Sequence, residues 1–106
     1  MTDSEWLRAL RRREAAQARR HGLSPLALLR MREEQGGLCA VCGVGGADVV
    51  DHDHGHCPGT TSCGRCVRGL VCDDCNQGLG RFQDDPGRMR EAAEYIERYR
   101  RRGPPR

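Results

Sequence analysis

Two cysteine pairs of the same spacing constrain this chain more than any other feature. They are Cys39-x-x-Cys42 and Cys72-x-x-Cys75. Four thiolates presented by two such knuckles are the usual ligand set of a closed, tetrahedral structural zinc site. A redox or iron centre of the rubredoxin type uses the same four residues and is the less favoured alternative. The spacing therefore predicts a small fold held together by one zinc ion.

The length and composition explain why such a chain needs a metal. It has 106 residues, of which 37% are hydrophobic and only 4% aromatic. A single domain of this size buries a limited core and usually depends on metals, disulfides or a partner chain. A structural zinc site contributes roughly 10–16 kcal/mol of apparent binding energy, which becomes folding energy when the metal-free site is not preformed. Zinc can therefore compensate for a weak core.

The seven cysteines also fit a disulfide-rich interaction protein, which is the rival to zinc. The odd count, the knuckle spacings and an N-terminus without a secretory signal pattern favour zinc. No apolar run reaches transmembrane length, so no membrane association is expected. These points predict a protein of a reducing, cytoplasmic compartment.

The charge distribution is suggestive rather than decisive. The net charge is +3 and all 18 basic residues are Arg, gathered mostly near the two ends, whereas the middle is rich in Asp. Basic flanks around an acidic centre suit a protein that contacts phosphates and holds a cation. Solvated helix faces would explain the same charges equally well.

A run of metal-binding side chains lies between the two cysteine pairs. It reads Asp51-His52-Asp53-His54, and Asn76 follows the last cysteine directly. Carboxylate, imidazole and amide groups suit an open site for a hard divalent cation such as Mg²⁺ or Mn²⁺. A neutral imidazole can also take a proton from water. The alternative is that these residues are surface polar groups or accessory zinc ligands.

Capping and hydrophobic patterns predict the order of the elements. In the middle of the chain the predicted order is strand, loop, strand and helix. Two helices are predicted first, from Thr2 to His21 and from Ser24 to Gln35. Two strands follow, over residues 47–51 and 67–71. A short helix from about 73–76 to 82 comes next, and a last helix follows Asp85-Pro86 and frays from Arg100. The apolar stripe of the first helix fades after Leu10, which predicts a loosely attached arm.

Three separated segments resemble the recombination endonuclease VII family, the phage-type nucleases of the HNH, or ββα-metal, superfamily. They run from Gln35 to Gly43, from Val50 to His54 and from Val67 to Gly80. The resemblance covers about residues 24–100. It implies an α+β fold, with a small zinc-stapled ββα-metal core and flanking helices.

The same resemblance implies a division of the chain and a set of partners. Residues 1–22 would form a basic helical N-terminal arm, 23–100 the nuclease domain and 101–106 a basic tail. DNA is the implied partner and the cytoplasm of a bacterial host the implied location. The best-known family member is a dimer, so a homodimer stays open here, as do contacts with phage packaging or recombination proteins.

The resemblance also implies roles for the site residues. The four knuckle cysteines would hold structural zinc. Asp51 and Asn76 would hold the catalytic Mg²⁺ or Mn²⁺, and His52 would be the general base. His54 would be a second active-site histidine, near the scissile phosphate. The implied activity is metal-dependent hydrolysis of DNA phosphodiester bonds.

The loop between the predicted strands departs from the simplest family pattern. It carries His56 and Cys57, followed by Cys63-Gly64-Arg65-Cys66, which is itself a knuckle. One imidazole and three thiolates make a credible second zinc site. His54 could supply the imidazole in place of His56. The alternative is a flexible loop with inert thiols.

Three arginines flank the predicted centre and could bind phosphate in a bidentate manner. They are Arg65, Arg68 and Arg81, and each could equally be a surface residue. The rival to a nuclease is a non-catalytic zinc-ribbon module that binds DNA. Such a module would explain the cysteines and arginines, but it would have no need of Asp51, His52 and Asn76 together.

Overall fold

The structure, a computed structural model, describes residues 2–105, and it confirms the predicted α+β class. Met1 and Arg106, the outer ends of the predicted arm and tail, lie outside the described residues. The elements are α1 (Asp3–Arg20), α2 (Pro25–Glu34), β1 (Val49–His52), β2 (Val67–Val71), α3 (Asp73–Arg81) and α4 (Pro86–Arg102). None of the described helices combines the length and apolar character needed to cross a bilayer.

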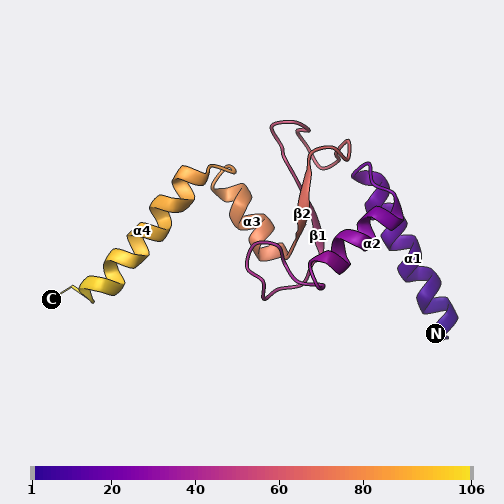
Figure 1. Cartoon of the computed structure of the whole chain (residues 1–106), viewed down its shortest axis with the longest axis horizontal. Coiled ribbons are helices and arrows are strands. Elements are labelled where there is room, and N and C mark those ends of the chain that lie inside the picture. Colours follow the sequence, from indigo (N-terminus) through magenta and orange to yellow (C-terminus); the bar gives the residue numbers. More distant parts are fainter. Residues whose placement is uncertain (1, 106) are drawn as a thin grey trace.

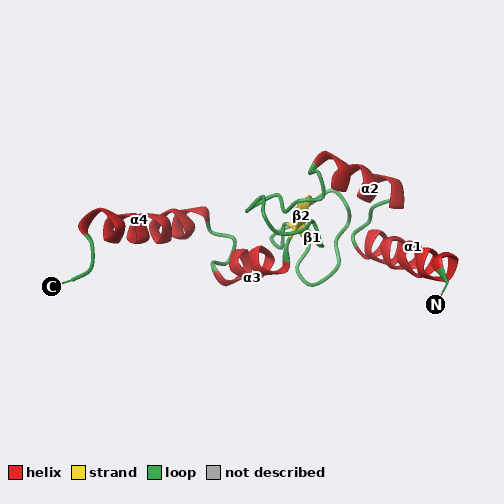
Figure 2. Ribbon diagram, turned by 90° about the horizontal axis from the view of Figure 1, so that it is seen from below, coloured by secondary structure: helices red, strands yellow, loops and turns green. Residues whose placement is uncertain are grey.

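The molecule is elongated, with principal extents of 61 × 33 × 22 Å. The antiparallel pair β1–β2 stands in the middle, α2 and α3 lie on either side of it, and α1 and α4 form the two ends (Figure 1). The view from below shows the same succession, with α4 extending away from the rest of the chain (Figure 2). The sheet, its connecting loop and α3 therefore form the part of the fold that can assemble a site.

Side-chain caps set the starts of the helices. Thr2 and Glu5 form a complete capping box at α1, and the Ser24 hydroxyl accepts a hydrogen bond from the first turn of α2. Asp85 caps α4 in the same way. The cap of α3 is the sulfur of Cys72, which accepts from the Cys75 amide at 3.5 Å. The start of α3 is therefore tied to a predicted metal ligand.

The last helix is longer than predicted. It continues through Arg100 to Arg102 and ends at Gly103, whose φ of +81° favours glycine. Arginine is a good helix former, and a positive charge in the last turn interacts favourably with the helix dipole. The basic residues that suggested fraying therefore support the helix end instead.

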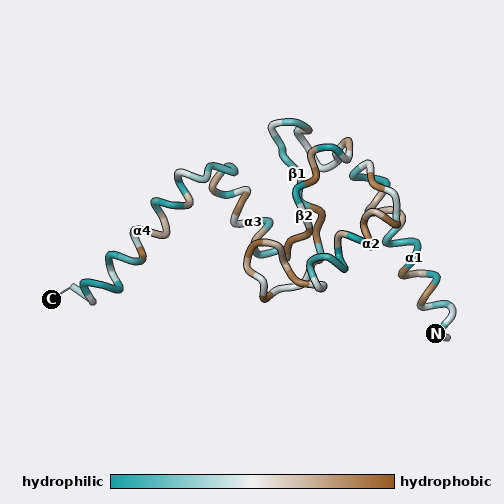
Figure 3. Tube along the Cα trace, viewed as in Figure 1, coloured by the Kyte–Doolittle hydropathy of each residue, from teal (hydrophilic) through white to brown (hydrophobic). Residues whose placement is uncertain are grey.

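A small core joins both strands to the first two helices. Its buried members are Ala18, Leu28, Ala47, Val50 and Leu70. Hydrophobic colouring follows β2 and the segment that carries the first knuckle, whereas α4 is mostly hydrophilic (Figure 3). The fully buried Ala18 brings the C-terminal half of α1 into this core, which the fading apolar stripe did not predict.

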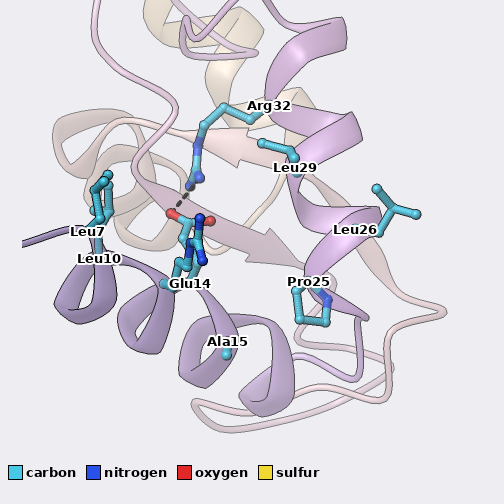
Figure 4. Close-up of a pocket in the computed structure, with 9 residues that line it drawn as sticks. Leu7, Leu10, Glu14, Ala15, Pro25, Leu26, Leu29 and Arg32 are labelled. Carbon is cyan, nitrogen blue, oxygen red and sulfur yellow. Dashed lines mark hydrogen bonds and ion pairs between the residues drawn. The ribbon is translucent and has the colours of Figure 1, made fainter. Parts of the chain in front are cut away.

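The N-terminal half of α1 faces α2 across an open apolar groove. Arg32 donates to Glu14 at 2.6 Å, and this ion pair bridges the two helices (Figure 4). Leu7, Leu26 and Leu29 line the groove, and each is about half exposed. Few contacts therefore hold the outer half of α1 against α2.

The side chain of Gln35 joins the end of α2 to β2. The amide nitrogen of Gln35 donates to the carbonyls of Leu38 at 2.9 Å and Leu70 at 2.7 Å, and its oxygen accepts from the Leu70 amide at 2.9 Å. Gln35 thus takes the place of a neighbouring strand along part of the open edge of β2. An added Cβ at Gly69 would lie 3.3 Å from the Gln35 oxygen, so the close approach favours glycine there.

We predict that Gln35→Ala destabilises the zinc-loaded protein by roughly 2–3 kcal/mol, because the Leu38 carbonyl and the Leu70 amide lose their partner. The Leu70 carbonyl keeps the Ala40 amide as a donor. Urea unfolding at a fixed free-zinc concentration would measure the change. Glu34→Ala, at an exposed neighbouring position, serves as the matched control. Equal stability of the two variants would show that the Gln35 contacts contribute nothing net.

Candidate metal centres and active site

The two knuckles come together at one point of the fold. The ligand atoms of Cys39, Cys42, Cys72 and Cys75 all lie within 4.8 Å of one another, and the Cys42 and Cys72 sulfurs are 3.9 Å apart. Sulfurs about 2.3 Å from a tetrahedral zinc ion lie about 3.8 Å from each other. All seven cysteines are free thiols. This core cluster, as we call these four residues, is therefore compatible with structural zinc.

Local hydrogen bonding prepares the core cluster for a cation. Burial of Cys39 opposes its ionisation, but hydrogen bonds from nearby backbone amides outweigh burial and lower the pKa of this thiol to about 6. The neighbouring Cys72 sulfur has the opposite effect on Cys75 and raises the pKa of that thiol to about 12. Four thiolates cannot coexist at such distances without a positive charge between them, which a zinc ion would supply.

The loop between β1 and β2 brings together a second group of metal-binding side chains. The ligand atoms of His56, Cys57, Cys63 and Cys66, which we call the loop cluster, also lie within 4.8 Å of one another. The His56 Nε2 and Cys63 Sγ atoms are 3.8 Å apart, close to the roughly 3.6 Å expected for a nitrogen and a sulfur on one zinc ion. The loop cluster is compatible with zinc as well.

An irregularity in the sheet explains how two consecutive polar residues of β1 are both buried. Asp51 pairs with Gly69 but His52 pairs with Val67, so Arg68 is an extra residue on β2. Such a bulge re-aims side chains and disturbs the alternation of faces along a strand. Asp51 and His52 are accordingly only 6% and 3% exposed.

The bulge also brings Arg68 onto the Asp51 carboxylate. Its Nε atom donates to Oδ2 at 2.7 Å and its terminal nitrogen to Oδ1 at 2.9 Å. The same terminal nitrogen lies 3.3 Å from an oxygen of Asp84. The hydrogen bonds to Asp51 raise the pKa of the Arg68 guanidinium above its ordinary value. Asp51, the predicted cation ligand, is therefore already paired with the positive guanidinium of Arg68. That guanidinium also lies within hydrogen-bonding distance of the Asp84 carboxylate.

His52 is held at one ring nitrogen by the backbone of the loop. Its Nε2 atom lies 3.0 Å from the carbonyl oxygen of Cys57. A carbonyl can only accept a hydrogen bond, so Nε2 carries a proton and the neutral ring keeps its free lone pair on Nδ1. The geometry thus selects one tautomer of His52.

Two other histidines and one aspartate surround this ring. The His54 ring centroid lies 4.3 Å from that of His52, and the His54 side chain is half exposed. Its Nδ1 atom is 3.7 Å from Asp84. On the other side the buried His21 ring lies 5.5 Å from His52, and burial lowers the pKa of His21, aided by His52 and Arg20.

Sequence reasoning missed the roles of His21 and Asp84. His21 ends the predicted first helix, and because histidine is common at helix C-termini, no local signal marks it as part of a site. Asp84 directly precedes the cap of α4 and carries no local signal either. Its positive φ of 55°, uncommon for a residue other than glycine, is visible only in the structure.

The other predicted site residues are less closely associated with Asp51 and His52. Asn76 lies half-buried in α3, and no hydrogen bond joins it to Asp51 within residues 2–105. Arg65 and Arg81 are exposed. The role of Asp53 is local, because its side chain accepts from the Gly55 amide at 2.9 Å and shapes the loop.

One family of known proteins matches most of the chain. The family model described as recombination endonuclease VII matches residues 13–98. The match includes both strands, α2, α3 and both clusters. No curated protein and no solved structure gives a significant match.

We predict that Cys42→Ser abolishes zinc binding at the core cluster and leaves the chain largely unfolded. The lost metal energy, roughly 10–16 kcal/mol, equals or exceeds the whole stability of a typical domain. Metal analysis and far-UV circular dichroism would measure both effects. Thr60→Ala, at an exposed loop position outside both clusters, is the control. A folded Cys42→Ser protein with an unchanged melting temperature would contradict the prediction.

Proposed function

Since this chain belongs to the recombination endonuclease VII family, a family of nucleases, we propose that it is a metal-dependent DNA endonuclease of the HNH type. In this proposal His52 is the general base. Asp51 and Asn76 hold a catalytic Mg²⁺ or Mn²⁺, and the core cluster holds structural zinc.

The tautomer of His52 is the observation that carries the proposal. A general base needs an unprotonated lone pair in a fixed position. The hydrogen bond from Nε2 to the Cys57 carbonyl leaves Nδ1 free, and burial of the ring prevents it from turning to solvent. A non-catalytic DNA-binding module would have no use for a buried and oriented imidazole beside a buried carboxylate.

The donor set around Asp51 supports a site for a hard cation. Its carboxylate is buried at the end of β1, and α3, which carries Asn76, packs against that strand. A bound divalent cation would stabilise the charge that develops on the phosphate and on the leaving oxygen. Arg68 competes for the same carboxylate, and Asp84 offers Arg68 another partner when Asp51 is needed for the metal.

The protein residues then divide the work of hydrolysis. His52 Nδ1 takes a proton from water, whose oxygen attacks phosphorus. The bond from phosphorus to the 3′-oxygen breaks, and that oxygen takes a proton from solvent to become a hydroxyl. The imidazolium of His52 later returns its proton to solvent. In this proposal His54, which is half exposed, and the guanidinium of Arg68 contact the phosphate. The exposed Arg65 and Arg81 would supply further phosphate contacts.

We predict that zinc-loaded protein nicks supercoiled plasmid in Mg²⁺ or Mn²⁺, and that His52→Ala lowers kcat by about 10²–10⁴-fold, the usual contribution of a general base. Gel analysis of plasmid forms at matched zinc content would test this. Thr60→Ala should cut like the wild type. Equal cutting by His52→Ala would remove His52 from this role, and DNA binding without cutting by any form would favour the binding module.

We further predict opposite effects of Arg68→Gln on the two ligands. Without the competing guanidinium, Mn²⁺ should bind at least about threefold more tightly, because a positive charge leaves the carboxylates. Binding of DNA should weaken, because a phosphate contact is lost. Mn²⁺ titration by electron paramagnetic resonance, without DNA, would measure the first effect. Arg90→Gln on α4 makes the same charge change far from Asp51, and equal Mn²⁺ affinities of the two variants would place the cation elsewhere.

A further inference from the structure

One residue of the loop takes part in both the loop cluster and the orientation of His52. The sulfur of Cys57 belongs to the cluster with His56, Cys63 and Cys66, and its backbone carbonyl accepts from His52. The chain thus places the partner of the proposed base on a residue whose side chain is itself a candidate metal ligand.

The loop has little else to hold that carbonyl in position. None of the described residues from 53 to 65 belongs to a helix, a strand or the hydrophobic core. A loop of this kind has many conformations available, and ordering each residue costs about 1–2 kcal/mol. A metal ion bound by four of its side chains would cross-link the loop and offset that cost.

The polar contacts of the loop locate its two sides, whereas the Cys57 amide donates only to the nearby Asp53 carbonyl, at 3.0 Å, in a local turn. The Asp53 amide donates to the Cys66 carbonyl at 2.9 Å and closes the base of the loop. The Ser62 amide donates to the Arg20 carbonyl at 3.0 Å, and the Ser62 hydroxyl lies 3.2 Å from His21 Nδ1. These bonds fix the two sides of the loop, and the cluster lies between them.

The end of α1 accepts the loop closely. Gly22 has a φ of +67°, and a Cβ atom there would overlap the backbone of Cys63. The loop is therefore seated against α1 at the residue that contributes one of the cluster sulfurs. His52 contacts the same loop through the Cys57 carbonyl.

We propose that the loop cluster is a second zinc site that acts as a positioning device for His52, by holding the Cys57 carbonyl against its Nε2–H. This inference rests on the proposed function insofar as His52 is the base, but the orientation of the ring can be measured without any reaction. With the loop zinc bound, Nε2 keeps its proton and Nδ1 faces the substrate. Without it, the carbonyl moves away and the ring samples both tautomers.

The first test measures the zinc content of the protein and the tautomer of His52 in the absence of DNA. The wild type should hold two zinc ions per chain, one in each cluster, and Cys63→Ser one. Long-range ¹⁵N–¹H NMR of the imidazoles should show the Nε2–H tautomer of His52 in the wild type and averaged tautomers in Cys63→Ser. Cys63→His restores a fourth ligand and should therefore restore the second zinc ion and the Nε2–H tautomer of His52. Thr60→Ala should change neither the zinc content nor the tautomer.

Each outcome of this test decides the inference. Two zinc ions in Cys63→Ser would show that the loop cluster does not need its fourth ligand and would overturn the site. Loss of one zinc with an unchanged His52 tautomer would overturn the coupling. Should Cys63→Ser fail to fold, His56→Asn removes the exposed imidazole ligand and makes the same comparison.

The second test reads catalysis. Partners that orient an active-site histidine typically contribute about ten- to a hundredfold, so kcat of Cys63→Ser should fall by about that factor. The KM for plasmid and the affinity for Mn²⁺ should change little, and Cys63→His should recover most of the rate. If Cys63→Ser shows the expected tautomer change but the wild type cuts no DNA, the proposed function fails and the positioning of His52 by the loop stands.

Discussion

The convergence of four cysteines, a set compatible with one structural zinc ion, is the constraint on which the rest of this structure depends. The core cluster ties the knuckle after α2 to the start of α3, where Cys72 is at once a candidate ligand and the helix cap. The buried apolar core is small and joins only α1, α2 and the two strands. It leaves α3, which has no buried residues, without a strong apolar anchor. The four cysteines of the core cluster are therefore the main link between α3, which carries Asn76, and the first knuckle.

A local defect of the sheet, rather than its regular geometry, creates the polar centre. A regular strand would have turned Asp51 and His52 to opposite faces. The bulge at Arg68 lets both be buried, and each finds a hydrogen-bonding partner, Asp51 in Arg68 and His52 in the Cys57 carbonyl. A buried polar group without such a partner would cost free energy. The two buried residues therefore require the bulged strand and the loop to adopt these positions together.

The two clusters differ in what they can influence. The core cluster joins the first knuckle to the start of α3. The loop cluster lies in a segment without regular structure and adjoins the hydrogen-bonding partner of a single active-site ring. The arginine-rich helices α1 and α4 form the two ends of the elongated molecule (Figure 1). A short chain thus keeps apart a cluster that joins elements, a loop that holds one imidazole and two basic helices.

The sequence by itself determined the elements and the metal clusters, because capping residues, hydrophobic periods and cysteine spacings are local signals. It led to β2, to all four helix starts and to the eight residues of the two clusters. Tertiary structure alone decided which nitrogen of His52 is free, that Arg68 occupies Asp51, and that Asp84 and His21 lie beside the site. These depend on one unpaired residue in a strand and on a loop seated against a distant helix. No local pattern encodes such contacts, since they arise only when segments remote in the chain pack together.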